Sequence, residues 1–300
     1  MSEPFLSGMT IAYRAVAAGY PLAESLRSML PICDEVVVNV GKSDDGTLEA
    51  VRAVGSDKIR ILEGDWDLNL HAKGLTLSLE TNRAKEACRG RWALYLQADE
   101  VLHEDDLPYL ADLVRRLDGR ADADGVSFRY LHFYGSPRYV QDHFFRWYTR
   151  AIRLVRNDPA IRSVGDALKF RRFTAGRPRR LREVRGRAGI FHYGWARPPR
   201  IMVEKQKQFE KFYRAGEVWE RKSTSLTPDR IYAELGNLRL FTGTHPAVMA
   251  ERVAASDWDF DARLDRQPPR WIRVTLMFTW YLLARFATKT LRRMGLRRTT

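Results

Sequence analysis

The chain has 300 residues, of which 45% are hydrophobic, and carries a formal net charge of +14. This composition excludes a globally disordered chain and suffices for one large α/β domain with an extension, or for two domains. Cys33 and Cys88 offer neither a metal-binding spacing nor a disulfide framework, so we expect a reduced, cytoplasmic protein. The first residues lack the features of a signal peptide, and no apolar run reaches the ~18 residues of a membrane-spanning helix.

Short predicted strands and helices alternate through the first hundred residues. Strands are expected at 9–14, 35–40, 58–62 and 91–97, and helices from Pro21 onward, at 48–54 and at 75–88. This alternation predicts a largely parallel sheet of Rossmann-like type. No Gly-x-Gly-x-x-Gly follows the first strand and no Walker loop is present, which disfavours a dinucleotide site.

The second half of the chain is less regular in its pattern. Residues 104–117 predict a helix and residues 125–133 a strand, whereas the aromatic stretch 134–156 is expected to be irregular. Residues 191–195 predict a short strand or turn. A helix at 202–215 follows, and the remainder is expected to be mostly helical.

The positive charge is concentrated in two stretches. Residues 169–187 hold nine basic residues and one acid, residues 285–298 hold six basic residues and no acid, and the rest of the chain is balanced. Such local charge is poor support for a nucleic-acid-binding surface, although Phe170 and Phe173 could stack on bases. A non-catalytic nucleic-acid-binding protein therefore stays an alternative, and we otherwise expect no nucleic-acid partner.

The predicted strand at 91–97 is buried in character and leads into a pair of acids. Five apolar residues, 92–96, predict a strand covered on both faces, and Gln97-Ala98-Asp99-Glu100 follows. Ligands of open α/β sheets bind at the carboxyl ends of the strands, and carboxylates there suit a hard divalent cation. A solvated acidic turn is an equally good interpretation of this stretch alone.

Four motifs in order resemble a family 2 glycosyltransferase, over about residues 10–199. They are Asp34-Glu35-Val36-Val37-Val38, Ser43-Asp44-Asp45-Gly46-Thr47, Thr81-Asn82-Arg83-Ala84 and Tyr95-Leu96-Gln97-Ala98-Asp99-Glu100. The resemblance implies a GT-A-type, Rossmann-like mixed α/β sheet with helices on both faces at 1–215, and a mostly helical extension at 216–300. It also implies inverting transfer of a sugar from a nucleoside-diphosphate sugar to a hydroxyl acceptor, in surface polysaccharide or envelope glycoconjugate synthesis.

The resemblance implies roles for nine residues. Asp99 would bind Mn²⁺ or Mg²⁺, His192 would complete the metal site, and Asp166 would be the catalytic base. Gln97 stands where the family usually has the first acid of Asp-x-Asp, and Asn39 where it often has an Asp. The residues implied for nucleotide binding are Asn39, Ser43, Asp45, Asn82, Arg83 and Gln97.

These roles have alternatives. Asp166 could cap a turn, His192 could be a core histidine, and Asp142-His143 is a rival catalytic pair. Glu100 could support Asp99 or cap the next helix. A sugar nucleotidyltransferase is a second enzymatic interpretation, but no glycine-rich phosphate loop follows the first strand.

The C-terminal region contains 11 uncharged residues, 274–284, between two arginines. As a helix this stretch would be about 16 Å long, roughly half of a ~30 Å hydrocarbon core, so it cannot span a membrane. It either packs into the protein or dips into an anionic membrane, with Trp271, Trp280 and Tyr281 at the interface and basic residues on the head groups. The second interpretation predicts peripheral attachment to the cytoplasmic face of the inner membrane and suits a lipid-linked acceptor.

Overall fold

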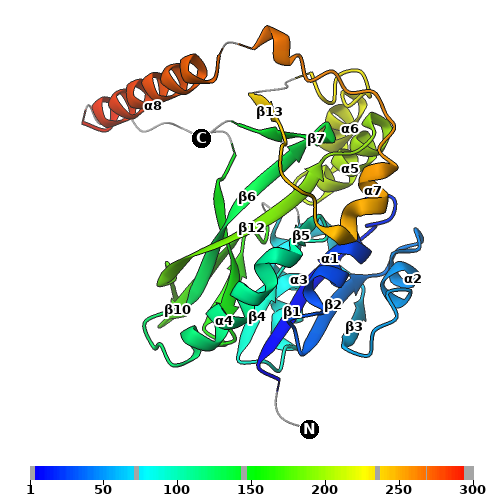
Figure 1. The fold of residues 1–300 in the computed structure, drawn as a ribbon, viewed down its shortest axis with the longest axis vertical. Coiled ribbons are helices and arrows are strands. Elements are labelled where there is room, and N and C mark those ends of the chain that lie inside the picture. Colours follow the sequence, from blue (N-terminus) through cyan, green and yellow to red (C-terminus); the bar gives the residue numbers. More distant parts are fainter. Residues whose placement is uncertain (1–3, 71–73, 143–146, 234–236, 268, 294–300) are drawn as a thin grey trace.

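The computed structural model describes residues 4–70, 74–142, 147–233, 237–267 and 269–293. Its centre is one large mixed sheet, in which ten strands of these residues take part (Figure 1). Four strands run parallel and lie side by side. In spatial order they are β4 (Trp92–Tyr95), β1 (Leu6–Ala12), β2 (Glu35–Gly41) and β3 (Ile59–Gly64). All four strands expected in the first hundred residues are therefore present, with shifted ends.

The other half of the sheet is mainly antiparallel. β8 (Arg150–Arg156) pairs with β4 and with β6 (Gly125–Tyr134), and β7 (Ser136–Gln141) extends the sheet beyond β6. The expectation of irregular structure at 134–156 is wrong, because β7 and β8 lie there. The strand β8 was not recognised because charged residues interrupt its apolar pattern. One of them, Arg153, is fully buried and forms an ion pair with the buried Glu100.

A long strand, β12 (Glu183–Trp195), runs parallel to β6 and antiparallel to β5 (Glu100–Leu102). The short strand expected at 191–195 is the last part of β12. The pairing places Glu100 opposite His192 and His192 beside His132 of β6. Residues far apart in the sequence thereby meet next to the end of β4.

Helices cover both faces of the sheet, as expected. α1 (Leu22–Met29), α2 (Thr47–Arg52) and α4 (Leu107–Asp118) pack into one hydrophobic cluster on one face. α3 (Leu75–Glu86) packs into a second cluster on the opposite face. The expected fold class, a mixed α/β sheet with helices on both faces, is confirmed.

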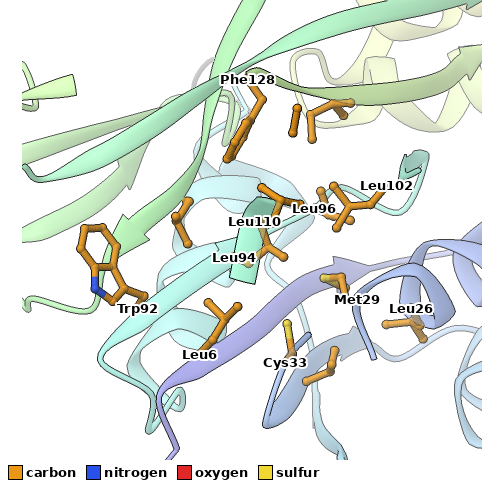
Figure 2. Packing of buried hydrophobic residues seen from close by; sticks show 14 of the residues in the cluster. Leu6, Leu26, Met29, Cys33, Trp92, Leu94, Leu96, Leu102, Leu110 and Phe128 are labelled. Atoms are coloured by element: carbon orange, nitrogen blue, oxygen red, sulfur yellow. The ribbon is translucent and has the colours of Figure 1, made fainter. Parts of the chain in front are cut away.

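Alternation along β2 shows how the sequence produces these layers. Val36 and Val38 belong to the cluster that contains Leu26 of α1, part of which Figure 2 shows. Val37 between them belongs to the cluster that contains Ala84 of α3. Because successive side chains of a strand point to opposite faces, a strand buried on both sides needs a continuous apolar run.

The chain beyond residue 215 is mostly helical and packs partly on the sheet. It contains α6 (Gly216–Thr224), α7 (Ala250–Ala254) and α8 (Arg270–Arg293), and β13 (Leu238–Leu240) pairs with β7. α8 extends away from the body of the molecule (Figure 1). Within the described residues, no helix has the length and apolar character that crossing a bilayer requires.

Glu35, at the start of β2, ties three elements together. Its buried carboxylate accepts hydrogen bonds from the backbone N–H of Arg89, from the side chains of Arg60 and Arg89, and from the Ser7 hydroxyl. Burial alone would raise the pKa of Glu35, but these donors outweigh it and lower the pKa to about 2.

We expect Glu35→Gln to lower the free energy of unfolding at pH 7 by about 2–3 kcal/mol, because charge-assisted hydrogen bonds are lost. Since the carboxyl's pKa is depressed in the folded state, its contribution is present above pH ~5 and disappears as the pH falls towards 2. Urea unfolding at pH 7 and pH 3 measures both effects. Glu63→Gln, at an exposed ion pair with Arg52, is the matched control. An equal loss at both pH values would contradict this account.

Candidate active site

A cavity of about 290 Å³ opens at the carboxyl ends of β1 and β4. It brings together four of the residues singled out in the sequence, which come from different parts of the chain: Gln97, Asp99, Asp166 and His192. Aromatic side chains form much of the remaining wall, namely those of Tyr13, Tyr20, Trp66, Trp147, Tyr148 and Trp195. The cavity lies where the sequence predicted a ligand site.

Glu100 stabilises the turn that contains Gln97 and Asp99. The backbone N–H of Gln97 donates to Glu100 Oε2 at 3.0 Å, and Tyr130 donates its hydroxyl hydrogen to Oε1 at 2.8 Å. Arg153 binds the same carboxylate through two hydrogen bonds of 2.7 Å, and both side chains are fully inaccessible to solvent. Glu100 therefore positions the Asp99 turn, and the helical turn that follows is capped by His103 instead.

We expect Arg153→Met to lower the free energy of unfolding by about 3–5 kcal/mol, since it leaves Glu100 buried without its partner. The double variant Arg153→Met/Glu100→Gln removes both charges and should be less destabilised than the single variant. Urea denaturation of the three proteins provides the comparison. A cost below about 1 kcal/mol for the single variant would show that the pair does not hold this turn.

Two histidines fix each other's protonation beside Asp99. His132 Nε2 lies 2.7 Å from the Tyr148 carbonyl oxygen, which can only accept, so His132 carries its hydrogen on Nε2. In the neutral ring Nδ1 is then an acceptor, and it receives the Nδ1–H of His192 at 2.9 Å. The Nε2 lone pair of His192 is left facing Asp99 Oδ2 at 3.6 Å.

Burial supports this neutral arrangement of the two rings. It lowers the pKa of His192, and burial with the neighbouring His192 lowers the pKa of His132 to about 3. Asp99 is buried too, which alone would raise its pKa, but neighbouring groups, the cations Lys205 and Arg197 among them, outweigh burial and lower it. An ionised carboxylate therefore faces an imidazole lone pair, and a cation or a hydrogen-bond donor between the two atoms would satisfy both acceptors.

The space in front of these two atoms exists because residue 194 is glycine. A Cβ at Gly194 would lie 2.4 Å from His192 Nε2 and 2.8 Å from Asp99 Oδ2. An oxygen and a neutral imidazole nitrogen suit Mn²⁺, and Mg²⁺ less well. The described residues contain no group of three or more His, Cys, Asp or Glu that could hold a metal, so diphosphate oxygens would have to supply further ligands.

We expect Gly194→Ala to weaken nucleoside-diphosphate binding in the presence of Mn²⁺ by at least about tenfold, because the methyl group fills the space at Asp99 and His192. Calorimetry measures the affinity. Gly119→Ala is the control, since a Cβ there meets nothing within 4 Å. Wild-type affinity in Gly194→Ala would argue against a cation at this position.

Asp166 reaches the cavity from a tight hairpin between β9 (Ile161–Val164) and β10 (Lys169–Thr174). The backbone on either side is left-handed, with φ of 66° at Gly165 and 61° at Ala167. Such a conformation is unfavourable for alanine and is found at sites where the surrounding structure holds it in place. The Tyr213 hydroxyl donates to Asp166 Oδ2 at 3.4 Å, which leaves the other carboxylate oxygen for a ligand.

Five residues implied for nucleotide binding are not among the cavity's lining residues. Asn39 is buried and donates to the backbone and side chain of Glu80. Ser43 donates to Asp45, which also accepts from the backbone N–H of Ala17 and so holds the loop after β1. For these three residues the contacts describe a structural role, and nucleotide binding by them stays a prediction.

The other two lie on α3. Asn82 exchanges two hydrogen bonds with the backbone of Ser163 in β9, at 3.1 and 2.7 Å. The guanidinium of Arg83 is half exposed, lies over Gly64 at the end of β3 and is 3.9 Å from Glu80. Asn82 thereby connects α3 to the Asp166 hairpin.

Asp142 of the rival catalytic pair lies elsewhere. Asp142 is buried outside the cavity lining and is within 4 Å of Arg273 and Arg239, at 3.6 and 3.9 Å. His143 lies outside the described residues. The geometry therefore favours Asp166 over Asp142 as the carboxylate next to a ligand in the cavity.

Sequence reasoning overlooked several residues of the site. Tyr13 and Trp66 stack in the cavity wall with ring centroids 5.6 Å apart, and the buried indole N–H of Trp66 has no hydrogen-bond partner among the described residues. Lys205 was detectable, because it follows Met202 by three residues on the apolar face of α5 (Pro199–Lys211). His132 carries no sequence signal, since only strand pairing brings it to His192.

Neither a family profile nor a curated protein sequence matches this chain. Among solved structures, residues 1–349 of S. aureus TarS are similar with a TM-score of 0.39 and 14% identity, over 77% of this chain and 72% of that one. The match covers 42% of a longer TarS structure.

Two further solved structures have lower TM-scores. Mycobacterium tuberculosis glucosyl-3-phosphoglycerate synthase, with Mn²⁺ and UDP, has a TM-score of 0.31 and 16% identity, over 44% of this chain and 45% of that one. A 4-diphosphocytidyl-2C-methyl-D-erythritol synthase from Anaerococcus prevotii has a TM-score of 0.33 and 13% identity, over 51% and 70% of the two chains. At these levels no residue role passes from those proteins to this chain.

Proposed function

We propose that this protein is a glycosyltransferase that moves a sugar from a nucleoside-diphosphate sugar to a hydroxyl acceptor. The observation that carries the proposal is the convergence of Asp99, His192 and Asp166 on one cavity at the carboxyl ends of parallel strands. Two of these residues present lone pairs to one point, and the third is a separate carboxylate. Metal-assisted group transfer with a general base needs this division of roles.

In the proposed reaction, Asp166 accepts the proton of the acceptor hydroxyl. The acceptor oxygen forms a bond to the anomeric carbon of the sugar, and the bond from that carbon to the diphosphate oxygen breaks, with its electron pair leaving on the nucleoside diphosphate. Attack from the opposite side inverts the configuration. Asp99 and His192 would hold Mn²⁺ or Mg²⁺, which neutralises charge on the departing diphosphate.

The walls of the cavity suit the other parts of the two substrates. Tyr13 and Trp66 offer flat faces for a nucleotide base, and Gln97 offers an amide for a ribose hydroxyl. A second cavity of about 540 Å³ shares Trp147 and Trp195 with the first and provides space for the acceptor.

Product analysis tests the proposal. The protein should release a nucleoside diphosphate from one or more nucleotide sugars, offered as a panel of UDP-, GDP-, dTDP- and ADP-sugars with Mn²⁺ or Mg²⁺. Release of pyrophosphate from a nucleoside triphosphate and a sugar phosphate would instead identify a sugar nucleotidyltransferase. If neither product forms and no nucleotide binds, the assignment fails.

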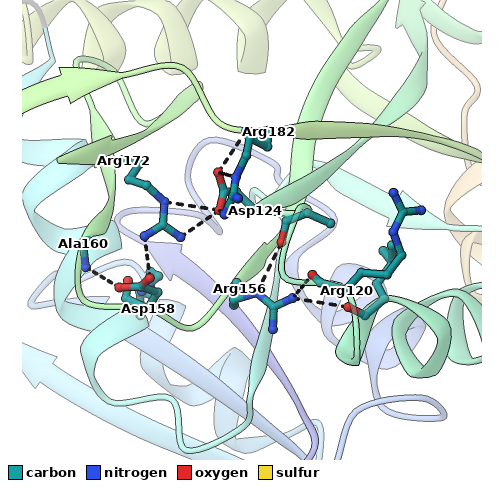
Figure 3. A network of polar contacts seen from close by, with 10 residues as sticks. Arg120, Asp124, Arg156, Asp158, Ala160, Arg172 and Arg182 are labelled. Carbon is teal, nitrogen blue, oxygen red and sulfur yellow. Dashed lines mark hydrogen bonds and ion pairs between the residues drawn. The ribbon is translucent and has the colours of Figure 1, made fainter. Parts of the chain in front are cut away.

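The contacts of the first basic stretch disfavour the nucleic-acid alternative. Phe170 is fully buried, with its ring edge against Tyr95, and cannot stack on a base. Arg172 and Arg182 both bind the buried Asp124, a network that Figure 3 shows. These side chains connect β10 to the residues that precede β6 and β12. Salt-dependent, micromolar binding to generic DNA or RNA in a filter assay would revive the alternative.

We also infer that α8 attaches the enzyme to an anionic membrane surface. Its first turns contact the body through Arg273, which donates to Gln267, and through Met277, which accepts from Asn237. Around the rest of its circumference α8 exposes six large apolar side chains: Trp271, Leu276, Phe278, Trp280, Leu282 and Leu283. Residues 270–300 contain no acid, so a second copy of this helix would repel it, whereas anionic head groups would attract it.

Vesicle flotation tests this attachment. The full chain should float with vesicles that contain phosphatidylserine, and the triple variant Leu276→Ser/Trp280→Ser/Leu283→Ser should not. Charge reversal at Arg292 and Arg293 should weaken flotation more than reversal at the exposed Arg177 and Arg179 of the other basic stretch. If the full chain stays unbound, or if it is a dimer that the triple variant converts to a monomer, the membrane assignment is wrong.

A further inference from the structure

Lys205 is a buried cation in the wall of the cavity, and the proposed reaction gives it no role. It projects from α5, and its side chain is 9% exposed. Its ammonium donates to the Gly194 carbonyl oxygen at 2.7 Å and lies 3.8 Å from Asp99 Oδ2, beyond hydrogen-bond distance. Its Nζ atom lies 5.7 Å from the ring centroid of Tyr20 and 5.6 Å from that of Trp195.

The described surroundings satisfy only part of this group's hydrogen-bonding capacity. An ammonium has three N–H donors, and within the described chain one acceptor, the Gly194 carbonyl, lies within hydrogen-bond distance. A buried charge without full pairing is costly, and such groups are retained where a ligand completes them. The ammonium lies in the cavity wall, so a ligand there can reach it.

The charges around Lys205 favour an anion. Arg197 is buried nearby and donates to the carbonyl oxygens of Ala18 and Tyr193, and it forms no ion pair within 4 Å with a carboxylate of the described residues. Among the described residues, Asp99 is the one carboxylate that offsets the positive charge of Lys205.

We infer that Lys205 binds the diphosphate of the donor directly, as a cation built into the protein, so that part of the donor's affinity does not depend on a divalent metal. This inference rests on the proposed function and adds a phosphate-binding residue to it. The ammonium lies next to Asp99 and His192, where the diphosphate would reach both the metal site and Lys205. It would neutralise part of the charge on the departing group.

Lys205 is buried because it lies on the apolar face of α5. Met202, three residues earlier on the same face of α5, is buried, and the lysine stem continues this face. Lys207, two residues further on, has a side chain that is 35% exposed, pairs with Glu204 at 3.2 Å and does not line the cavity. The same helix therefore provides a matched control.

Calorimetric titration with UDP, GDP, dTDP and ADP, in Mn²⁺ and in excess EDTA, tests the inference. The wild-type protein should keep measurable affinity for its preferred nucleotide in EDTA. Lys205→Met and Lys205→Gln should lower that residual affinity by about 10- to 100-fold, the range of a hydrogen bond to a charged group. Lys205→Arg should retain most of it, and Lys207→Met should match the wild type.

The outcomes separate this inference from the proposed function. Binding that EDTA abolishes and Mn²⁺ restores, or Lys205 variants that bind in EDTA as the wild type does, would overturn the role of Lys205 and leave the transferase assignment intact. Absence of binding under both conditions would remove the proposed function itself. Because Lys205→Gln can still donate to the Gly194 carbonyl, it serves if the methionine variant does not fold.

Discussion

Asp99→Asn should reduce sugar transfer by roughly 10³-fold while the protein stays folded, because the substitution removes the carboxylate that faces the His192 lone pair. The amide keeps the size of the side chain, so the effect reports charge and not packing. Initial rates with the preferred nucleotide sugar provide the measurement, and the thermal unfolding midpoint reports the fold.

Asp112→Asn, at an exposed ion pair with Arg116 on α4, is the control for loss of one acidic charge. His192→Ala should lower affinity for the nucleoside diphosphate in Mn²⁺. If His192→Ala changes only the thermal midpoint, the histidine is a core residue. Turnover close to wild type in Asp99→Asn would remove the metal site from the mechanism.

Asp166→Asn should cut turnover by roughly 10²–10⁴-fold and leave nucleoside-diphosphate affinity nearly unchanged, because it removes a base and no donor-binding charge. The prediction follows from the position of Asp166 in the cavity wall, on a hairpin whose backbone is left-handed at Gly165 and Ala167. Single-turnover rates and calorimetry separate the two effects.

Tyr213→Phe tests the surroundings of this carboxylate. It removes the hydroxyl that donates to Asp166 Oδ2 at 3.4 Å and should alter turnover far less than Asp166→Asn. Near-normal turnover in Asp166→Asn would assign the base to another carboxylate, and Asp142 would be tested next. A parallel loss of nucleotide affinity would show that Asp166 binds the donor instead.

The parallel half of the fold was predictable because its strands are apolar runs separated by helices. In β2, continuous valines indicate burial on both faces, and the structure shows both faces covered. β8 was missed because Arg153 interrupts its apolar pattern, and the partner that makes this arginine tolerable lies 53 residues earlier in the chain. Local hydropathy carries no information about such a pair.

A residue's position in the candidate site was predictable where a local sequence motif contained that residue. It was less predictable where the pairing of distant strands determines the position. Asp99 follows from a short motif at the end of a predicted strand, Asp166 follows from the resemblance, and both line the cavity. Asn39 lies in a strand, where the face of each side chain alternates, and it points to Glu80 of α3. His132 reaches His192 only through the register of β6 with β12.

Nucleoside-diphosphate binding at the Asp99 cavity is the central claim. The most direct test is calorimetric titration of the wild-type protein and Asp99→Asn with UDP, GDP, dTDP and ADP in Mn²⁺. We predict that the wild type binds at least one of these nucleotides and that Asp99→Asn binds it at least about tenfold more weakly. Absence of binding to all four by the wild-type protein, or equal binding by the two proteins, would contradict the claim.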